Sequence, residues 1–153
     1  MSNYLKDLED SRLLFKTFCD GLMYGMFFYH GEALHRVTSI EGLDETVNGV
    51  YPIKECKPCL RSMSSMTEEE KKELLTLLVG ENSISYFKVE NNGIINTDEN
   101  IQFGRNWQYH WLNFSNENIS LYVDWLNKKH FDYRGLIPMG LALVASEGIY
   151  KQD

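Results

Sequence analysis

The spacing of apolar residues at the start of the chain predicts a helix over residues 4–20. Apolar side chains recur there at intervals of three or four residues, and Gly21 is a natural end for such a helix. The residues that fall near one face are Leu5, Leu8, Phe15, Phe18, Cys19 and Leu22, and this face is widened by Leu13 and Leu14. The chain is therefore expected to open with an amphipathic helix.

The segment that follows is typical of strands. Residues 23–29 are aromatic and apolar, His30-Gly31 supplies a turn, and residues 33–40 alternate between two faces. A third strand is expected over residues 47–53, in which Asn48-Gly49 could form a bulge or a turn. The simplest arrangement of these strands is an antiparallel meander.

The clearest helix start in the chain lies at Thr67. Thr67 and Glu70 have the spacing of a capping box, in which the Thr67 hydroxyl accepts from the Glu70 backbone N–H and the Glu70 side chain reaches back. The glutamates at 68–70 also match the positive end of the helix dipole. Leucines at 74, 75, 77 and 78 form the apolar side, and Gly80 ends the helix.

A β-hairpin is predicted over about residues 84–97, because two strand-like runs flank an Asn-Gly pair, which is the strongest short hairpin signal. Residues 98–114 are ambiguous. Trp107, Tyr109 and Trp111 alternate as in a strand, but the same run fits a loop that lays its rings across the core.

A last helix begins after Ser115, which is a suitable N-cap. Its apolar side is formed by Ile119, Tyr122, Val123, Leu126 and His130. A short final strand is expected over residues 141–144. The fold class is therefore α+β, with an N-terminal helix, an antiparallel meander, a capped middle helix, a β-hairpin, a C-terminal helix and a short final strand. Because no repeat or long linker divides the chain, we expect one domain over residues 1–153.

Composition and charge restrict the classes of function. Apolar residues make up 43% of the chain and aromatic residues 13%, which excludes a disordered composition. The net charge of −7 disfavours a general nucleic-acid binder. The N-terminus has no signal-peptide core, and no stretch approaches the ~18 apolar residues of a membrane helix. Three cysteines without a secretion signal are typical of free thiols, so we expect a cytoplasmic protein without membrane contact.

Two segments, KPCLRSMSSMTEEE at residues 57–70 and WLNKKHFDYRGLI at residues 125–137, carry a family resemblance. They resemble motifs of small uncharacterised proteins from phages, prophages and mobile elements of gut anaerobic bacteria, whereas the N-terminal meander is a looser match. Members of that family usually have an aromatic residue where Cys59 stands here and a proline where Ser62 stands. The resemblance implies a phage-related accessory protein, and it carries over no activity and no catalytic residue.

Cys56 and Cys59 are the best catalytic lead in the sequence. A C-x-x-C pair can cycle between dithiol and disulfide, and Lys57 would favour a thiolate. Such a pair ordinarily stands at the first turn of a helix, but the predicted helix begins about eight residues later. The resemblance also implies that Cys59 is replaceable. Buried or incidental thiols are the simpler interpretation.

Metal and phosphate chemistry have little support. A zinc site needs four ligands, whereas here one cysteine pair is accompanied only by Cys19 and by scattered histidines at 30, 35, 110 and 130. The glycines do not form a phosphate loop, and no serine elbow occurs. We therefore expect no metal and no cofactor.

The segment from His130 to Arg134 clusters a base, an acid and a guanidinium. His130, Asp132 and Arg134 could serve a hydrolytic enzyme. Structural roles explain them more simply, since His130 and Arg134 can bond the last carbonyls of the helix and Asp132 can pair with Arg134. We favour the structural interpretation.

Two further groups of residues are candidates for binding. One is a run of rings and the other a short basic patch: Trp107, Tyr109, Trp111, Lys54, Lys57 and Arg61. The rings could stack on bases or sugars, although aromatic residues are also enriched at protein interfaces. The basic patch could grip nucleic acid, which the acidic net charge disfavours.

The leading hypothesis is a non-enzymatic accessory protein that works through contacts with a protein partner or as a homo-oligomer. It follows from the lack of a catalytic motif, the acidic charge, the many rings and the resemblance. The alternatives are a thiol-dependent or hydrolytic enzyme and a nucleic-acid-binding module.

Overall fold

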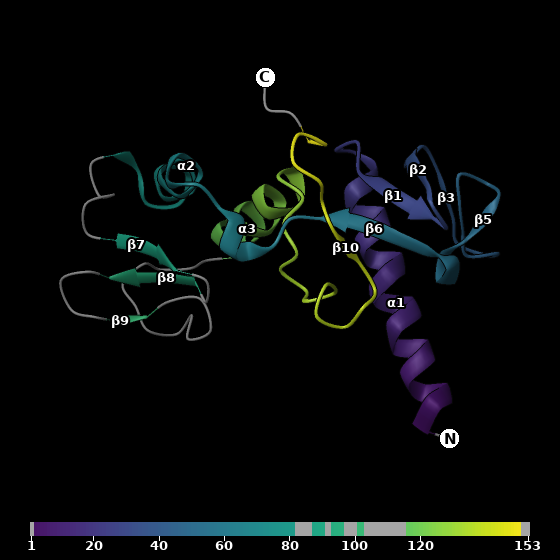
Figure 1. The fold of residues 1–153 in the computed structure, drawn as a ribbon. Coiled ribbons are helices and arrows are strands. Elements are labelled where there is room, and N and C mark those ends of the chain that lie inside the picture. The colour runs from purple at the N-terminus through teal and green to yellow at the C-terminus, as the bar shows by residue number, and fades with distance from the viewer. Residues whose placement is uncertain (1, 82–86, 91–92, 97–100, 103–115, 151–153) are drawn as a thin grey trace. The chain divides into compact units, whose positions relative to one another are not determined.

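A computed structural model describes residues 2–81, 87–90, 93–96, 101–102 and 116–150 (Figure 1). The chain divides into two compact units. The first unit contains Met1–Ser62 and Asn127–Asp153, and the second contains Met63–Leu126. The expected single domain stays a prediction, and each unit is described by itself below.

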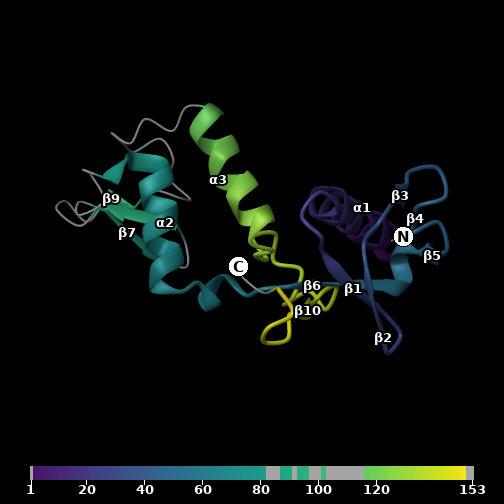
Figure 2. The same ribbon diagram turned by 90° about the horizontal axis from the view of Figure 1, so that it is seen from above.

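The first unit is a helix packed on a four-stranded sheet. The helix α1 spans Ser2–Leu22, and the strands are β1 (Phe27–His30), β2 (Ala33–Arg36), β6 (Cys56–Leu60) and β10 (Leu143–Val144). Their order is β10-β6-β1-β2, in which β1 is antiparallel to both of its neighbours and β10 runs parallel to β6. Figure 2 shows α1 on one side of these strands.

Phe18 and Phe28 join the helix to the sheet. Both side chains are fully buried, and their rings meet edge to face at 5.6 Å between centroids. Where α1 ends, a Cβ on Gly21 would come within 2.6 Å of the Met26 sulfur, so a glycine is needed for this close approach. The core of the unit thus forms between the second half of α1 and the strands.

The predicted meander is interrupted by a second, smaller sheet. It consists of β3 (Ile40–Glu41), β4 (Thr46–Val47) and β5 (Tyr51–Pro52), all antiparallel, and the 3-10 helix η1 (Ile53–Glu55) follows. The possible turn at Asn48-Gly49 is present and separates β4 from β5. The strand expected over residues 33–40 is wrong in extent and ends at Arg36. The reason is the Asn48 side chain, which accepts from the backbone N–H of Thr38 at 2.7 Å and donates to the Arg36 carbonyl at 2.9 Å. These backbone groups bond to a side chain instead of continuing the ladder.

Tyr150 joins β1 to β6 beyond their last backbone pair. The strands pair as far as Phe28 and Pro58, and proline has no N–H to give. The Tyr150 hydroxyl then accepts from the Phe27 N–H at 2.9 Å and donates to the Cys59 carbonyl at 2.7 Å. One hydroxyl therefore satisfies two backbone groups that would otherwise face each other as the next pair.

The described part of the second unit contains a 3-10 helix, two α-helices and a three-stranded antiparallel sheet. They are the 3-10 helix η2 (Met63–Ser65), α2 (Glu68–Val79), β7 (Phe87–Glu90), β8 (Gly93–Asn96), β9 (Ile101–Gln102) and α3 (Asn116–Lys128). The predicted hairpin is confirmed by the pairing of β7 with β8. α2 packs on β7, and the Trp125 indole N–H on α3 donates to Glu73 on α2 at 3.3 Å. The Ser115 cap, and the ambiguous run over residues 98–114 apart from β9, lie outside the described residues.

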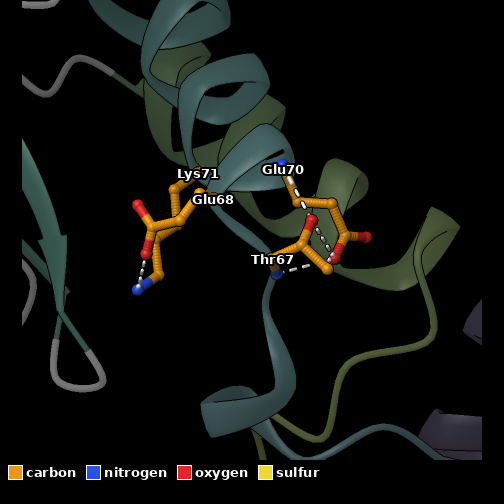
Figure 3. A network of polar contacts seen from close by, with 4 residues as sticks. All are labelled: Thr67, Glu68, Glu70 and Lys71. Carbon is orange, nitrogen blue, oxygen red and sulfur yellow. Dashed lines mark hydrogen bonds and ion pairs between the residues drawn. The ribbon is translucent and has the colours of Figure 1, made fainter.

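The capping box at the start of α2 is confirmed (Figure 3). The Glu70 backbone N–H donates to the Thr67 hydroxyl at 3.1 Å, and the Thr67 backbone N–H donates to the Glu70 carboxylate at 3.0 Å. Glu68 pairs with Lys71 at 3.3 Å on the exposed side. Two N–H groups at the helix start are thereby satisfied within the motif.

The α+β class is confirmed with all of its predicted parts, but two boundaries differ. α3 ends at Lys128, and His130 has a φ of 64°, so His130 stands beyond the helix and not on its apolar side. The last strand is shorter than residues 141–144 and contains only Leu143 and Val144.

The capping box gives a prediction for stability. Thr67→Ala removes the acceptor of the Glu70 N–H and should lower the free energy of unfolding by about 1 kcal/mol. The matched control is Thr76→Ala on the same helix, whose hydroxyl bonds only to the Lys72 carbonyl and whose loss should be close to neutral. Urea unfolding followed by circular dichroism measures both, and equal effects of the two substitutions would contradict the account.

Candidate functional site

α1 carries apolar residues on two sides, and only one side faces the core. Leu14 and Phe18 are buried, at 4% and 0% exposure. The residues along the other side of α1 are called the outer stripe here: Leu5, Leu8, Arg12, Phe15, Cys19 and Leu22. Leu5 is 57% exposed and Leu8 40%, whereas Phe15 is half-buried against the core. The predicted single apolar face therefore divides into a buried and an exposed part.

The first half of α1 has no strand beneath it. At 1.5 Å per residue the helix is about 31 Å long, roughly twice the length of the four- and five-residue strands that it covers. Figure 1 shows its first turns extending past the strands of the first unit. Residues 3–9 are all exposed, including Tyr4 at 66%. The apolar side chains of these turns thus remain in water.

An open groove of about 570 Å³ lies along the outer stripe. Its lining combines apolar and charged residues from α1 with the turn between β3 and β4: Glu9, Arg12, Leu13, Phe15, Lys16, Gly42 and Glu45. Leu43, at the same turn, is fully exposed. The groove is of the size of a ligand site, at roughly 300–1,000 Å³, and it carries charges of both signs.

The segment from His130 to Arg134 serves the fold of the first unit. The Asp132 carboxylate accepts from the backbone N–H groups of Leu136 and Ile137, at 2.8 and 2.9 Å. The expected Asp132–Arg134 pair is replaced, because the Arg134 guanidinium pairs with Asp20 on α1. Both side chains therefore hold the loop in place.

His130 is a buried, neutral ring. It stacks on Tyr150 at 3.7 Å between centroids, and it is 7% exposed. Burial, together with the nearby positive charge of Arg61, lowers the pKa of His130 to about 4, although a hydrogen bond with the Tyr24 backbone opposes this shift.

The cavity at the His130 segment is far too small for a substrate. It measures about 10 Å³ and is lined by His130, Asp132 and Arg134 among others. Substrate pockets are commonly roughly 300–1,000 Å³. The side chains of the His130 segment serve the fold, and the cavity beside them has no room for a ligand. The segment therefore does not favour the hydrolytic hypothesis.

Cys56 and Cys59 are buried free thiols on strand β6, each 1% exposed. Burial raises the pKa of both to about 11, and the Glu55 carboxylate adds to the shift at Cys56. The Cys56 thiol donates to the Pro52 carbonyl at 3.3 Å. A thiol of this pKa is a thiolate in roughly one molecule in ten thousand at neutral pH, so the site does not favour redox chemistry.

The basic patch is only partly directed outward. Lys54 and Lys57 are exposed, on η1 and β6. The Arg61 guanidinium lies over the Phe131 ring at 4.2 Å, within the first unit. The other binding candidates, Trp107, Tyr109 and Trp111, lie outside the described residues.

Two histidines that look scattered in the sequence meet on the sheet. The Tyr51 ring lies 4.7 Å from His30 and 4.6 Å from His35, and His30 contacts Glu55 at 3.2 Å. The antiparallel register of β1 and β2, with Phe28 opposite His35, brings these rings to one face. In the part of the chain that the structure describes, no group of three or more His, Cys, Asp or Glu side chains could hold a metal ion.

A scan against models of protein families found no match, and searches of curated proteins and of solved structures found none either. Among the described residues, the groove beside the outer stripe is much larger than the cavity at the His130 segment, and the exposed leucines of the stripe are left unused by the fold. Sequence reasoning missed the stripe because it assigned all apolar residues of the helix to one face. The signal was present, since Leu5 and Leu8 lie about 80° to 180° around the helix from Leu14 and Phe18 at 3.6 residues per turn.

The thiols give a second prediction. In dilute native protein, Ellman's reagent should react readily with Cys19 alone, because Cys56 and Cys59 are buried and have raised pKa values. All three should react in concentrated guanidinium chloride, and Cys19→Ser should remove the fast reaction. Rapid native modification of Cys56 or Cys59 would revive the redox hypothesis.

His130 gives a prediction for pH dependence. The unfolded chain takes up a proton near pH 6.5, whereas native His130 does so only near pH 4. Stability should therefore fall as the pH drops from 6.5 to 4, by up to on the order of 3 kcal/mol from this residue.

The test compares the native chain with His130→Asn, since asparagine tolerates the positive φ at this position. Unfolding free energies measured across that pH range should decline more steeply for the native chain than for the variant. Parallel pH profiles would show that His130 is not buried in its neutral form.

Proposed function

We propose that this protein acts by binding a protein partner through the outer stripe of α1 and the groove beside it. The observation that carries the proposal is the exposure of Leu5 and Leu8 on helical turns that extend beyond the sheet. Burying apolar surface contributes about 25 cal/mol per Å² to the free energy of association. A partner that covers Leu5 and Leu8 would therefore be bound more tightly. Contiguous exposed apolar surface is a common mark of interaction sites.

The described residues favour binding over catalysis. The two candidate catalytic groups, the thiols of β6 and the His130 segment, are buried and engaged in the fold. The groove along α1 is large enough for a ligand, but its polar lining is limited to Glu9, Arg12, Lys16 and Glu45, which are all exposed. Exposed charges of both signs suit a protein surface better than they suit a reaction centre.

A nucleic-acid partner has less support. The chain carries a net charge of −7, and the groove itself contains two acidic residues beside its two basic ones. Binding to a phosphate backbone needs an excess of positive charge along the contact. A protein partner therefore remains the better proposal for this surface.

The proposal extends to the setting of the protein. The resemblance of residues 57–70 and 125–137 to phage and mobile-element proteins supports an accessory role inside a bacterial cell. Within the described part of the chain, each helix is too short or too polar to cross a lipid bilayer.

Affinity capture tests the proposed function. Tagged native chain, Leu8→Glu and Leu77→Glu are each expressed together with an untagged copy, purified from the lysate, and compared for bound protein. Leu77 is the matched control, because it is an exposed leucine (42%) on α2 in the second unit. The native chain and the Leu77→Glu variant should capture the same partner, which is either a host protein or the untagged copy. The Leu8→Glu variant should capture much less of that partner. Equal capture by all three would contradict the proposal, as would a chain that binds nothing and turns over a small substrate.

A further inference from the structure

We infer that the partner of the outer stripe is a second copy of this chain, with the two α1 helices packed antiparallel. This inference rests on the proposed function, because it names the partner that the same surface binds. It is argued from the spacing of the stripe, from its charges and from the position of the groove.

The spacing of the outer stripe is that of a coiled-coil seam. Its members stand at positions 5, 8, 12, 15, 19 and 22, which alternate steps of three and four residues. This alternation is the a/d pattern by which two helices pack side by side. All members are apolar or weakly polar except Arg12. The buried residues Leu14 and Phe18 are not part of the series, whereas its member Phe15 is half-buried against the core. Leu5, Leu8, Arg12, Cys19 and Leu22 are exposed.

When two α1 helices pack antiparallel in one particular register, each residue of the seam lies beside another seam residue of the partner. When Leu5 packs against the partner's Leu22, Leu8 falls beside the partner's Cys19, and Arg12 falls beside the partner's Phe15. A two-fold axis repeats each of these contacts in reverse, as in most homodimers. The exposed first turns of each helix would thereby be covered by the last turns of the other.

The charges select the antiparallel pair over the parallel one. Glu9 and Lys16 flank the seam on the same side, seven residues apart, and both are exposed. In the antiparallel register, Glu9 of each copy faces the partner's Lys16. Arg12 lies over the partner's Phe15, an arrangement that favours a cation–π contact. A parallel pair would instead bring two Arg12 guanidinium groups together, which is repulsive.

The groove lies where the two helices would cross. Its α1 residues, from Glu9 to Lys16, span the two-fold axis of this register, which falls between Leu13 and Leu14. Glu45, on the opposite wall, would add a negative charge beside the partner's Arg12. The exposed Leu43 at the same turn would gain an apolar neighbour. The shape, the charge and the spacing thus all fit one occupant.

A directed disulfide tests the register. Leu8→Cys places a sulfur opposite the exposed native Cys19 of the partner, so mild oxidation with diamide should link two chains through positions 8 and 19. Peptide mapping by mass spectrometry identifies the linked positions. Leu8→Cys combined with Cys19→Ser should lose the 8–19 link, and Leu77→Cys, the matched surface control, should not link to position 19. A product linked only through 8–8 or 19–19 would overturn the antiparallel pairing.

Charge reversal tests the pairing without a new thiol. Sedimentation equilibrium should show that Glu9→Lys and Lys16→Glu each raise the dimer dissociation constant by roughly tenfold, because two ion pairs become repulsive in each case. The double variant should return to within about threefold of the native value. Failure of the double variant to recover, with all three chains folded by circular dichroism, would overturn the inference.

The outcomes separate this inference from the proposed function. A native chain that stays monomeric at high concentration, yet captures a different protein in a manner lost with Leu8→Glu, overturns the self-pairing and leaves the function standing. A chain that is monomeric and shows no capture dependent on Leu8 overturns both. A monomer in which the outer stripe is covered by residues 63–126 of its own chain would also count against self-pairing.

Discussion

The contact between Phe18 and Phe28 is the constraint on which the first unit depends. It fixes one side of α1 against the sheet, and the rest of the core forms around it: Leu14, Met26, Val37, Val47, Ile53, Cys56, Leu60, Leu136 and Ala142. The loop from Asp132 to Ile137 reinforces the same attachment, because Arg134 pairs with Asp20 near the end of the helix. All of these contacts involve the second half of α1, so the first half extends without support from the sheet.

This one-sided attachment explains why the protein has an exposed apolar surface. A helix twice as long as its strands can bury only part of its length, and a core that uses Leu14 and Phe18 leaves Leu5 and Leu8 in water. Such an arrangement is costly in a chain that works alone, but it is useful in one that binds. The catalytic alternatives depended on the thiols of β6 and on the His130 segment. These groups are instead buried in the fold and form hydrogen bonds with the backbone.

The parts of the fold that local chemistry determines could be predicted from the sequence. The capping box at Thr67 and the hairpin at the Asn-Gly pair depend only on neighbouring residues, and both are confirmed. The end of β2 at Arg36 could not be predicted, because it depends on the Asn48 side chain reaching back to residues 36–39. The burial of Cys59 and the bridging role of Tyr150 likewise depend on residues about ninety positions apart. The outer stripe was visible as apolar spacing, but its exposure depends on where the sheet ends.

The proposed dimer covers the outer stripe of α1 with a second copy of the chain. Amide hydrogen exchange of the peptide spanning the first turns of α1, measured by mass spectrometry over a wide range of protein concentration, tests it most directly. We predict rapid exchange in dilute protein, because these turns extend beyond the described strands of the first unit, and increasing protection as the concentration rises. Peptides from α2 should show no such change. Rapid exchange of the α1 peptide at every concentration would contradict the claim.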